Sequence, residues 1–124
     1  MYKRQVITSP DRSISLQGMT TGENYNIIVY GDSMDSLTGT YSVTYDADYL
    51  EVVSACALSD ELDASGNFSE FGIQILKNNP GIVEFSRSVV IPSGSQWTGA
   101  INIIRMRAKK SGNTTLNLLN SAAQ

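Results

Sequence analysis

The stretch from residue 40 to residue 58, TYSVTYDADYLEVVSACAL, decides the fold class of this chain. In its first half Tyr41, Val43 and Tyr45 alternate with threonine and serine. A period of two predicts a β-strand, because successive side chains of a strand point to opposite faces. The apolar residues on one side predict that this face of the strand is buried.

Two aspartates then mark a turn between two strands. Asp46 and Asp48 favour a turn, because aspartate side chains accept hydrogen bonds from nearby backbone N–H groups. The chain resumes with Leu50 and Val52 facing inward. The opposite register would bury the charge of Glu51. We therefore expect a strand that leaves one sheet, followed by a short strand that closes the edge of a sandwich.

The same period of two recurs along most of the chain, and helix signals are confined to residues 59–61. One segment ends in the strong turn signal NNPG, residues 78–81. Alternation, β-branched and aromatic residues and frequent turns together predict an antiparallel all-β sandwich or barrel. The residues expected between the sheets are Tyr41, Val43, Leu50, Val52, Ile73, Val83, Phe85, Ile104, Met106 and Leu116.

The composition narrows the range of functions. With 124 residues the chain fits one domain, which we expect to span residues 1–124. A net charge of −3 does not attract phosphate backbones, so nucleic acid is not an expected partner. No apolar run reaches the roughly 18 residues of a membrane span. Residues 1–10 lack the apolar core of a signal peptide.

The absence of histidine argues against an enzyme. It removes Ser-His-Asp and Cys-His catalysis together with the commonest transition-metal ligand. The stretch Gly31-Asp32-Ser33 therefore predicts a polar loop rather than an esterase nucleophile. The single cysteine, Cys56, is expected to be a small buried residue. We expect no catalytic residue, no metal site and no cofactor.

Three further features have a structural interpretation beside a functional one. The acidic segment from Asp60 to Glu70 lacks the spacing of a calcium loop, so a solvated loop is favoured. Trp97 could stack on a sugar ring, but packing over the end of the sandwich fits the burial habits of tryptophan better. Arg105 and Arg107 fit either a solvated strand face or a docking surface.

Three stretches resemble the cohesin domain, the receptor module that docks dockerin domains in bacterial cellulosomes and related surface enzyme complexes. LTGTYSVTYDADYLEVV, residues 37–53, resembles the third strand of the family and the bend after it. GIVEFSRS, residues 81–88, resembles its middle strand. WTGAINIIRMRAKKSGNTTLNL, residues 97–118, resembles its late strand, the next turn and the last strand. The first stretch is the most specific; the others are shared with cellulose-binding modules of the same superfamily.

The resemblance implies a fold, a partner and a site. It implies a nine-stranded sandwich with jelly-roll topology and a non-catalytic docking function, as a module of a larger secreted bacterial protein outside the cell or on its surface. The implied partner is a small helical dockerin-like module that brings its own calcium. The docking surface of the family is the outer face of one sheet. At the matching positions this chain has Thr38, Thr40, Ser42, Glu84, Ser86, Ser88, Arg105 and Arg107.

We expect Thr40, Ser42, Glu84, Arg105 and Arg107 to share one exposed face, because each neighbours an inward apolar residue. The chain departs from the family pattern here, since the family often has asparagine and aspartate near the first two positions and apolar residues on the middle strand.

Two alternatives remain open from the sequence. A carbohydrate-binding module of the same fold would bind a polysaccharide, and a row of exposed coplanar aromatic side chains would favour it. A structural spacer domain of a surface protein would have no ligand of its own. A flat, polar, water-facing sheet would favour the docking module.

Overall fold

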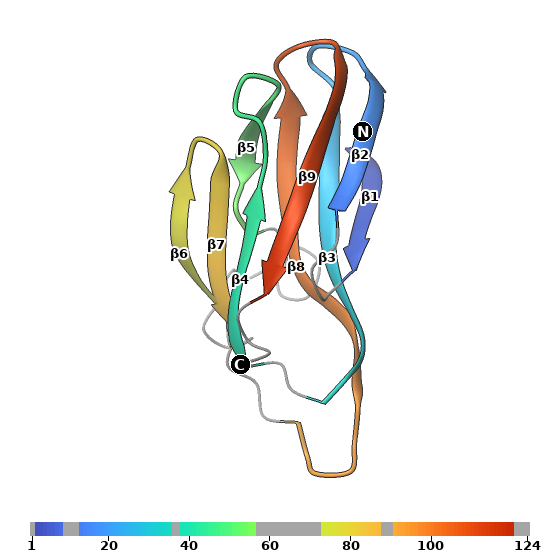
Figure 1. Cartoon of the computed structure of the whole chain (residues 1–124), viewed down its shortest axis with the longest axis vertical. Coiled ribbons are helices and arrows are strands. Elements are labelled where there is room, and N and C mark those ends of the chain that lie inside the picture. The colour runs from blue at the N-terminus through green and yellow to red at the C-terminus, as the bar shows by residue number, and fades with distance from the viewer. Residues whose placement is uncertain (1, 9–12, 36–37, 57–72, 88–90, 121–124) are drawn as a thin grey trace.

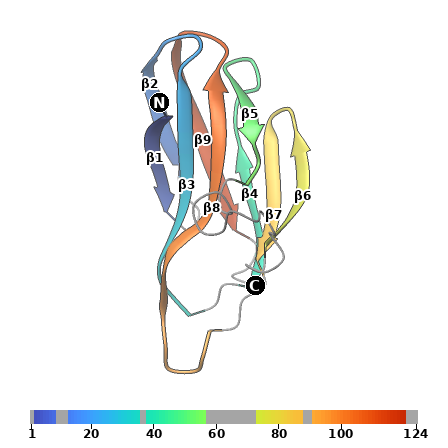
Figure 2. The same ribbon diagram turned by 180° about the vertical axis from the view of Figure 1, so that it is seen from behind.

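Two β-sheets form the structure, a computed structural model that describes residues 2–8, 13–35, 38–56, 73–87 and 91–120. One sheet has the strand order β1-β3-β8-β5 and the other β2-β9-β4-β7-β6. In Figure 1 the five-stranded sheet faces the viewer, and Figure 2 shows the four-stranded sheet from behind. The strands are β1 (Tyr2–Thr8), β2 (Ser13–Met19), β3 (Asn24–Met34), β4 (Gly39–Thr44), β5 (Leu50–Ser54), β6 (Ile73–Asn79), β7 (Ile82–Arg87), β8 (Trp97–Ala108) and β9 (Gly112–Asn120).

This strand order confirms the predicted all-β sandwich. The described residues form nine strands. The strand order is that of a jelly roll, with β2-β9-β4-β7 in one sheet and β3-β8-β5 in the other. Strand β1 was not predicted, because Lys3, Arg4 and Gln5 give its sequence a polar centre. It pairs with β3 in parallel, which departs from the otherwise antiparallel pairing of the described strands. Its Ile7 is nevertheless fully buried, in register with Val29.

The turn between β4 and β5 forms as the aspartates predict. Asp46 Oδ1 accepts a hydrogen bond from Asp48 N at 2.9 Å. The backbone oxygen of Asp46 accepts two more, from the N–H groups of Tyr49 and Leu50, each at 3.0 Å. The turn carries the chain from the five-stranded sheet to the four-stranded one, where β5 is an edge strand. The expected short strand at the sandwich edge is therefore confirmed.

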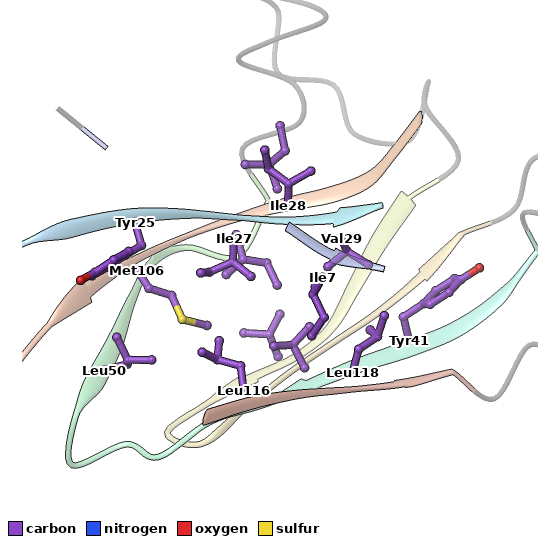
Figure 3. Close-up of a cluster of buried hydrophobic side chains, with 14 of the residues drawn as sticks. Ile7, Tyr25, Ile27, Ile28, Val29, Tyr41, Leu50, Met106, Leu116 and Leu118 are labelled. Carbon is purple, nitrogen blue, oxygen red and sulfur yellow. The ribbon is translucent and has the colours of Figure 1, made fainter. Parts of the chain in front are cut away.

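The core lies between the two sheets, and its residues alternate along the strands as predicted. Val52 is the exception among the ten expected residues, because it is only half-buried, next to a register shift in β5. Figure 3 shows Ile27 and Val29 pointing into the sandwich, while Ile28 lies on the other side of the same strand. The expected residues that are buried are Tyr41, Val43, Leu50, Ile73, Val83, Phe85, Ile104, Met106 and Leu116.

One cation, the guanidinium of Arg87, lies inside the sandwich. Arg87 is 6% exposed, and its Nη1 donates a hydrogen bond to the backbone oxygen of Ile101. Burial lowers the pKa of Arg87, and burial raises the pKa of the neighbouring Tyr41, since both charged forms lose water. The burial of Arg87 was not predicted. Its alternation with Val83 and Phe85 is the signal that places it inward.

The side-chain amide of Asn102 is also buried, at the point where the register between β8 and β3 shifts. Asn102 is fully buried, and its Nδ2 donates to the backbone oxygen of Ala55 at 3.0 Å. Its Oδ1 accepts a hydrogen bond from the backbone N–H of Ile103 at 2.8 Å. Both ends of the amide therefore have partners, which offsets the cost of removing it from water.

Cys56 and Trp97 lie as the sequence indicates. Cys56 is buried, at 5% exposure. Trp97 is half-buried and packs against the core, with its ring over Gly99, where a Cβ atom would lie 3.1 Å from the ring. The expected helical turn at residues 59–61 and the acidic segment 60–70 lie outside the described residues.

Tyr25 makes the stability of the fold sensitive to alkaline pH. Its ring is buried, and its hydroxyl donates to Glu23 Oε1 at 2.9 Å. Burial, this hydrogen bond and the charge of Glu23 together raise the pKa of Tyr25 from 10.0 to about 12. The folded state therefore holds this proton more tightly than the unfolded state does.

The contribution of Tyr25 to the free energy of unfolding should be present in full below about pH 10 and be lost as the pH rises from about 10 towards 12. Replacing Tyr25 with phenylalanine should remove part of this decrease, because the variant has no phenol to ionise. Urea unfolding at a series of pH values measures the slope. An unchanged slope in Tyr25→Phe would contradict the assignment.

Candidate docking surface

The candidate site is the outer face of the five-stranded sheet, called the β4–β7 face below. It is built from side chains that alternate with core residues, since one side of each strand packs inward and the other meets water. The side chains that define it are half-buried and small or acidic. They are Thr40, Ser42, Glu84 and Ser86.

One row of this face crosses four strands. Ser42 is in register with Glu84 on β7 and with Leu119 on β9, and Glu84 is in register with Lys77 on β6. The hydroxyl of Ser42 donates to Glu84 Oε2 at 3.1 Å. Leu119 is 54% exposed, more than any other large apolar side chain that the structure describes. The row thus offers an apolar contact, a hydrogen-bonded carboxylate and an ammonium group along one line.

A second row lies beside it and carries no charge. Thr40 is in register with Ser86, and Ser86 is in register with Gln74 on β6. Small hydroxyl side chains at the middle of a sheet allow another element to approach its surface closely. Apart from Leu119, the side chains of the two rows are polar and half-exposed or exposed, and a polar sheet face favours the docking module.

The sequence analysis missed Leu119, although a signal for it exists. Leu116 and Leu118 are buried and set the inward parity of β9, so Leu119 must face outward. Of the other expected site residues, Thr38 is exposed directly before β4. Ser88 lies outside the described residues.

Arg105 and Arg107 do not share this face, so the predicted single face was wrong. Both lie on β8, which pairs with β3 and β5 in the four-stranded sheet. The alternation along a strand shows which side chains point away from the core. It does not show to which of the two sheets the strand belongs, and each sheet has an outer face of its own.

The two arginines instead lie in cross-strand ladders of the four-stranded sheet. Arg105 Nε donates to Asn26 Oδ1 at 3.3 Å, and Arg107 Nε donates to Asn24 Oδ1 at 3.4 Å. Arg107 also lies 3.8 Å from a carboxylate oxygen of Glu51, with both side chains about half exposed. Such exposed pairs contribute little to stability, and they fit the solvated strand face that the sequence left open.

The described residues offer little for catalysis or metal binding. Ser33 has a positive φ of 55°, and its hydroxyl donates to Asp32 Oδ1 at 3.2 Å. Within the described ranges, no group of three or more histidine, cysteine, aspartate or glutamate side chains could hold a metal ion. In the same part of the chain, no helix has the length and apolar character to cross a membrane.

Comparison with known proteins gives a likeness in structure alone. No family profile matches the chain, and no curated protein matches it. A cohesin domain crystallised in a dockerin–cohesin complex, that of CaDoc0917 with CaCohA2, superposes with a TM-score of 0.59. The match covers 96% of this chain and 79% of that chain at 11% sequence identity. The chain therefore has a cohesin-like fold.

Proposed function

We propose that this chain is a non-catalytic protein-docking module that binds a dockerin-like partner through its β4–β7 face. The observation that carries the proposal is the superposition on a cohesin domain over 96% of the chain. That cohesin was crystallised with a dockerin. At 11% sequence identity, the residues that contact a partner are not carried over from the matched protein to this chain.

The chemistry of the β4–β7 face supports the same proposal. Central residues such as Thr40 and Ser42 are small, so the backbone of a helical partner can lie close to the sheet. The carboxylate of Glu84 gives such a partner a charged hydrogen-bond acceptor, and charge-assisted bonds are the stronger ones. Leu119 adds an apolar contact beside it. Interfaces commonly combine apolar anchors with a polar surround in this way.

A carbohydrate-binding platform of coplanar rings has less support. None of the aromatic side chains whose exposure the structure describes is classed as exposed, and Trp97 packs against the core. A stacking platform needs rings with a free face. The cohesin-like fold supports a place for the module, as residues 1–124, in a secreted or cell-surface protein assembly. Its function there would be to hold a partner and not to bind a polysaccharide along a row of rings.

The proposal is tested by calorimetry of the chain against dockerin modules encoded in the same genome. At least one should bind with one-to-one stoichiometry and a Kd below about 1 µM. A chelator should abolish binding by unfolding the partner, because the proposed partner carries the calcium, while the melting temperature of this chain stays unchanged. Failure of every dockerin to bind at about 100 µM would contradict the proposal.

A further inference from the structure

A cleft at one end of the sandwich lies apart from the β4–β7 face. It has a volume of about 380 Å³ and is lined by β5, by the turn before it, by the β6–β7 turn and by Lys109 after β8. Both turns lie at the upper end of Figure 1, where the edge strands β5 and β6 stand on the same side of the molecule. These edges belong to different sheets, so no ladder of hydrogen bonds closes the gap between them. The volume falls within the range of about 300–1,000 Å³ usual for small-molecule sites.

The walls of the cleft are fixed by hydrogen bonds within the chain. The hydroxyl of Tyr45 donates to the backbone oxygen of Asn79 at 3.2 Å, and Tyr45 N donates to Gly81 O at 3.0 Å. Gly81 has a φ of 98°, which glycine adopts without strain in the turn after Pro80. On the other side, Lys109 Nζ donates to the backbone oxygen of Ala47 at 2.9 Å. A cleft held in this way needs little ordering when a ligand binds.

The side chains that line the cleft include hydrogen-bond donors, hydrogen-bond acceptors and one aromatic ring. Asn78 and Asn79 are exposed amides, and each amide both donates and accepts. Glu51 and Lys109 contribute one negative and one positive group, so the described lining carries no net charge. The half-buried ring of Tyr45 forms part of the wall and presents an apolar surface.

The charges and polar groups of the lining fit some classes of ligand better than others. A phosphate or carboxylate ligand would require an excess of cations. A lipid chain would require a lining without charged groups, whereas here Glu51, Lys109 and two amides share the walls with the apolar residues Ala47, Leu50, Val52 and Pro80. A divalent cation would require several oxygen ligands from acidic groups, and among the described residues that line the cleft Glu51 alone is acidic. A neutral polyhydroxyl ligand matches amides, a carboxylate, an ammonium group and a ring. We infer that this cleft binds a neutral saccharide.

The inference is tested by two-dimensional NMR titration of the chain with cellotetraose, xylotetraose and mannotetraose. At least one should shift the backbone amide signals of Tyr45, Asn79 and Lys109, with a Kd of about 0.1–5 mM. Asn78→Ala removes an amide, and Glu51→Gln removes the charge of a carboxylate, both at exposed positions. Each should weaken that binding at least about threefold, and the double variant about tenfold.

Asn26→Ala is the matched control, since it removes an amide that contacts Arg105 on the outer face of the four-stranded sheet, and its affinity should equal that of the wild type. Three results would overturn the inference: no shifts with any of the three sugars up to about 20 mM, shifts confined to the end that carries Trp97, or an unchanged affinity in the double variant. Melting temperatures close to that of the wild type establish that the variants are folded.

Discussion

Replacing Phe85 with alanine should lower the free energy of unfolding by about 3–5 kcal/mol, the usual cost of deleting a buried aromatic ring. Phe85 is fully buried on β7, and its ring stacks on that of Tyr41 with centroids 5.5 Å apart and an interplanar angle of 15°. It is in register with Tyr41 on β4 and with Ile75 on β6. The substitution therefore leaves a cavity under three neighbouring strands, and rigid strands cannot close it fully.

Chemical denaturation measures this loss. Leu76→Ala is the matched control, because Leu76 is a large apolar side chain that is 45% exposed. Its removal should cost less than about 1 kcal/mol. A loss below about 1 kcal/mol for Phe85→Ala would mean that the sandwich is not held together at this stack.

The alternation of residues was enough to predict the inward face of most strands. Tyr41, Val43 and Phe85 are buried because one register satisfies the whole pattern, and a slip of one residue would expose all of them. The turn at Asp46 followed from local chemistry, since its side chain and backbone accept the hydrogen bonds that reverse the chain. Features decided by near neighbours in the sequence were thus predictable.

Features that depend on which strands pair with each other could not be predicted. The pattern around Arg105 predicts an outward side chain, but only the pairing of β8 with β3 and β5 assigns that side chain to the four-stranded sheet. Strand β1 was not predicted because its own sequence is polar. It is a strand because it pairs with β3. Arg87 is inward by its alternation with Val83 and Phe85, but charged residues are seldom buried, so the charge of the residue argues against the position that the alternation gives it.

The β4–β7 face should lose its partner when a large cation is placed at its centre. Ser42→Arg puts a long side chain on a strand flanked by β9 and β7, in line with Leu119 and Glu84. It should weaken binding of the proposed dockerin-like partner by about 2–4 kcal/mol, at least about thirtyfold, because the clash and the lost hydrogen bond fall at the middle of the interface. Calorimetry with the partner found by the genome-wide test measures this change.

Arg105→Ala is the matched comparison on the opposite sheet. Sheets of a sandwich pack about 10 Å apart, so a partner lying on one outer face cannot also contact the other. Arg105→Ala should therefore leave the affinity unchanged. A large loss from Arg105→Ala together with no loss from Ser42→Arg would move the interface to the four-stranded sheet.

The most direct test of the docking proposal is to map which sheet the partner covers, by amide hydrogen exchange of the chain with and without the dockerin-like module. Amide exchange should become slower along β4, β7 and the end of β9 near Leu119. The exchange rates of β3 and of the part of β8 around Arg105 should stay unchanged. Protection confined to β3 and β8 would contradict it, because the partner would then lie on the face opposite the row formed by Leu119, Ser42, Glu84 and Lys77.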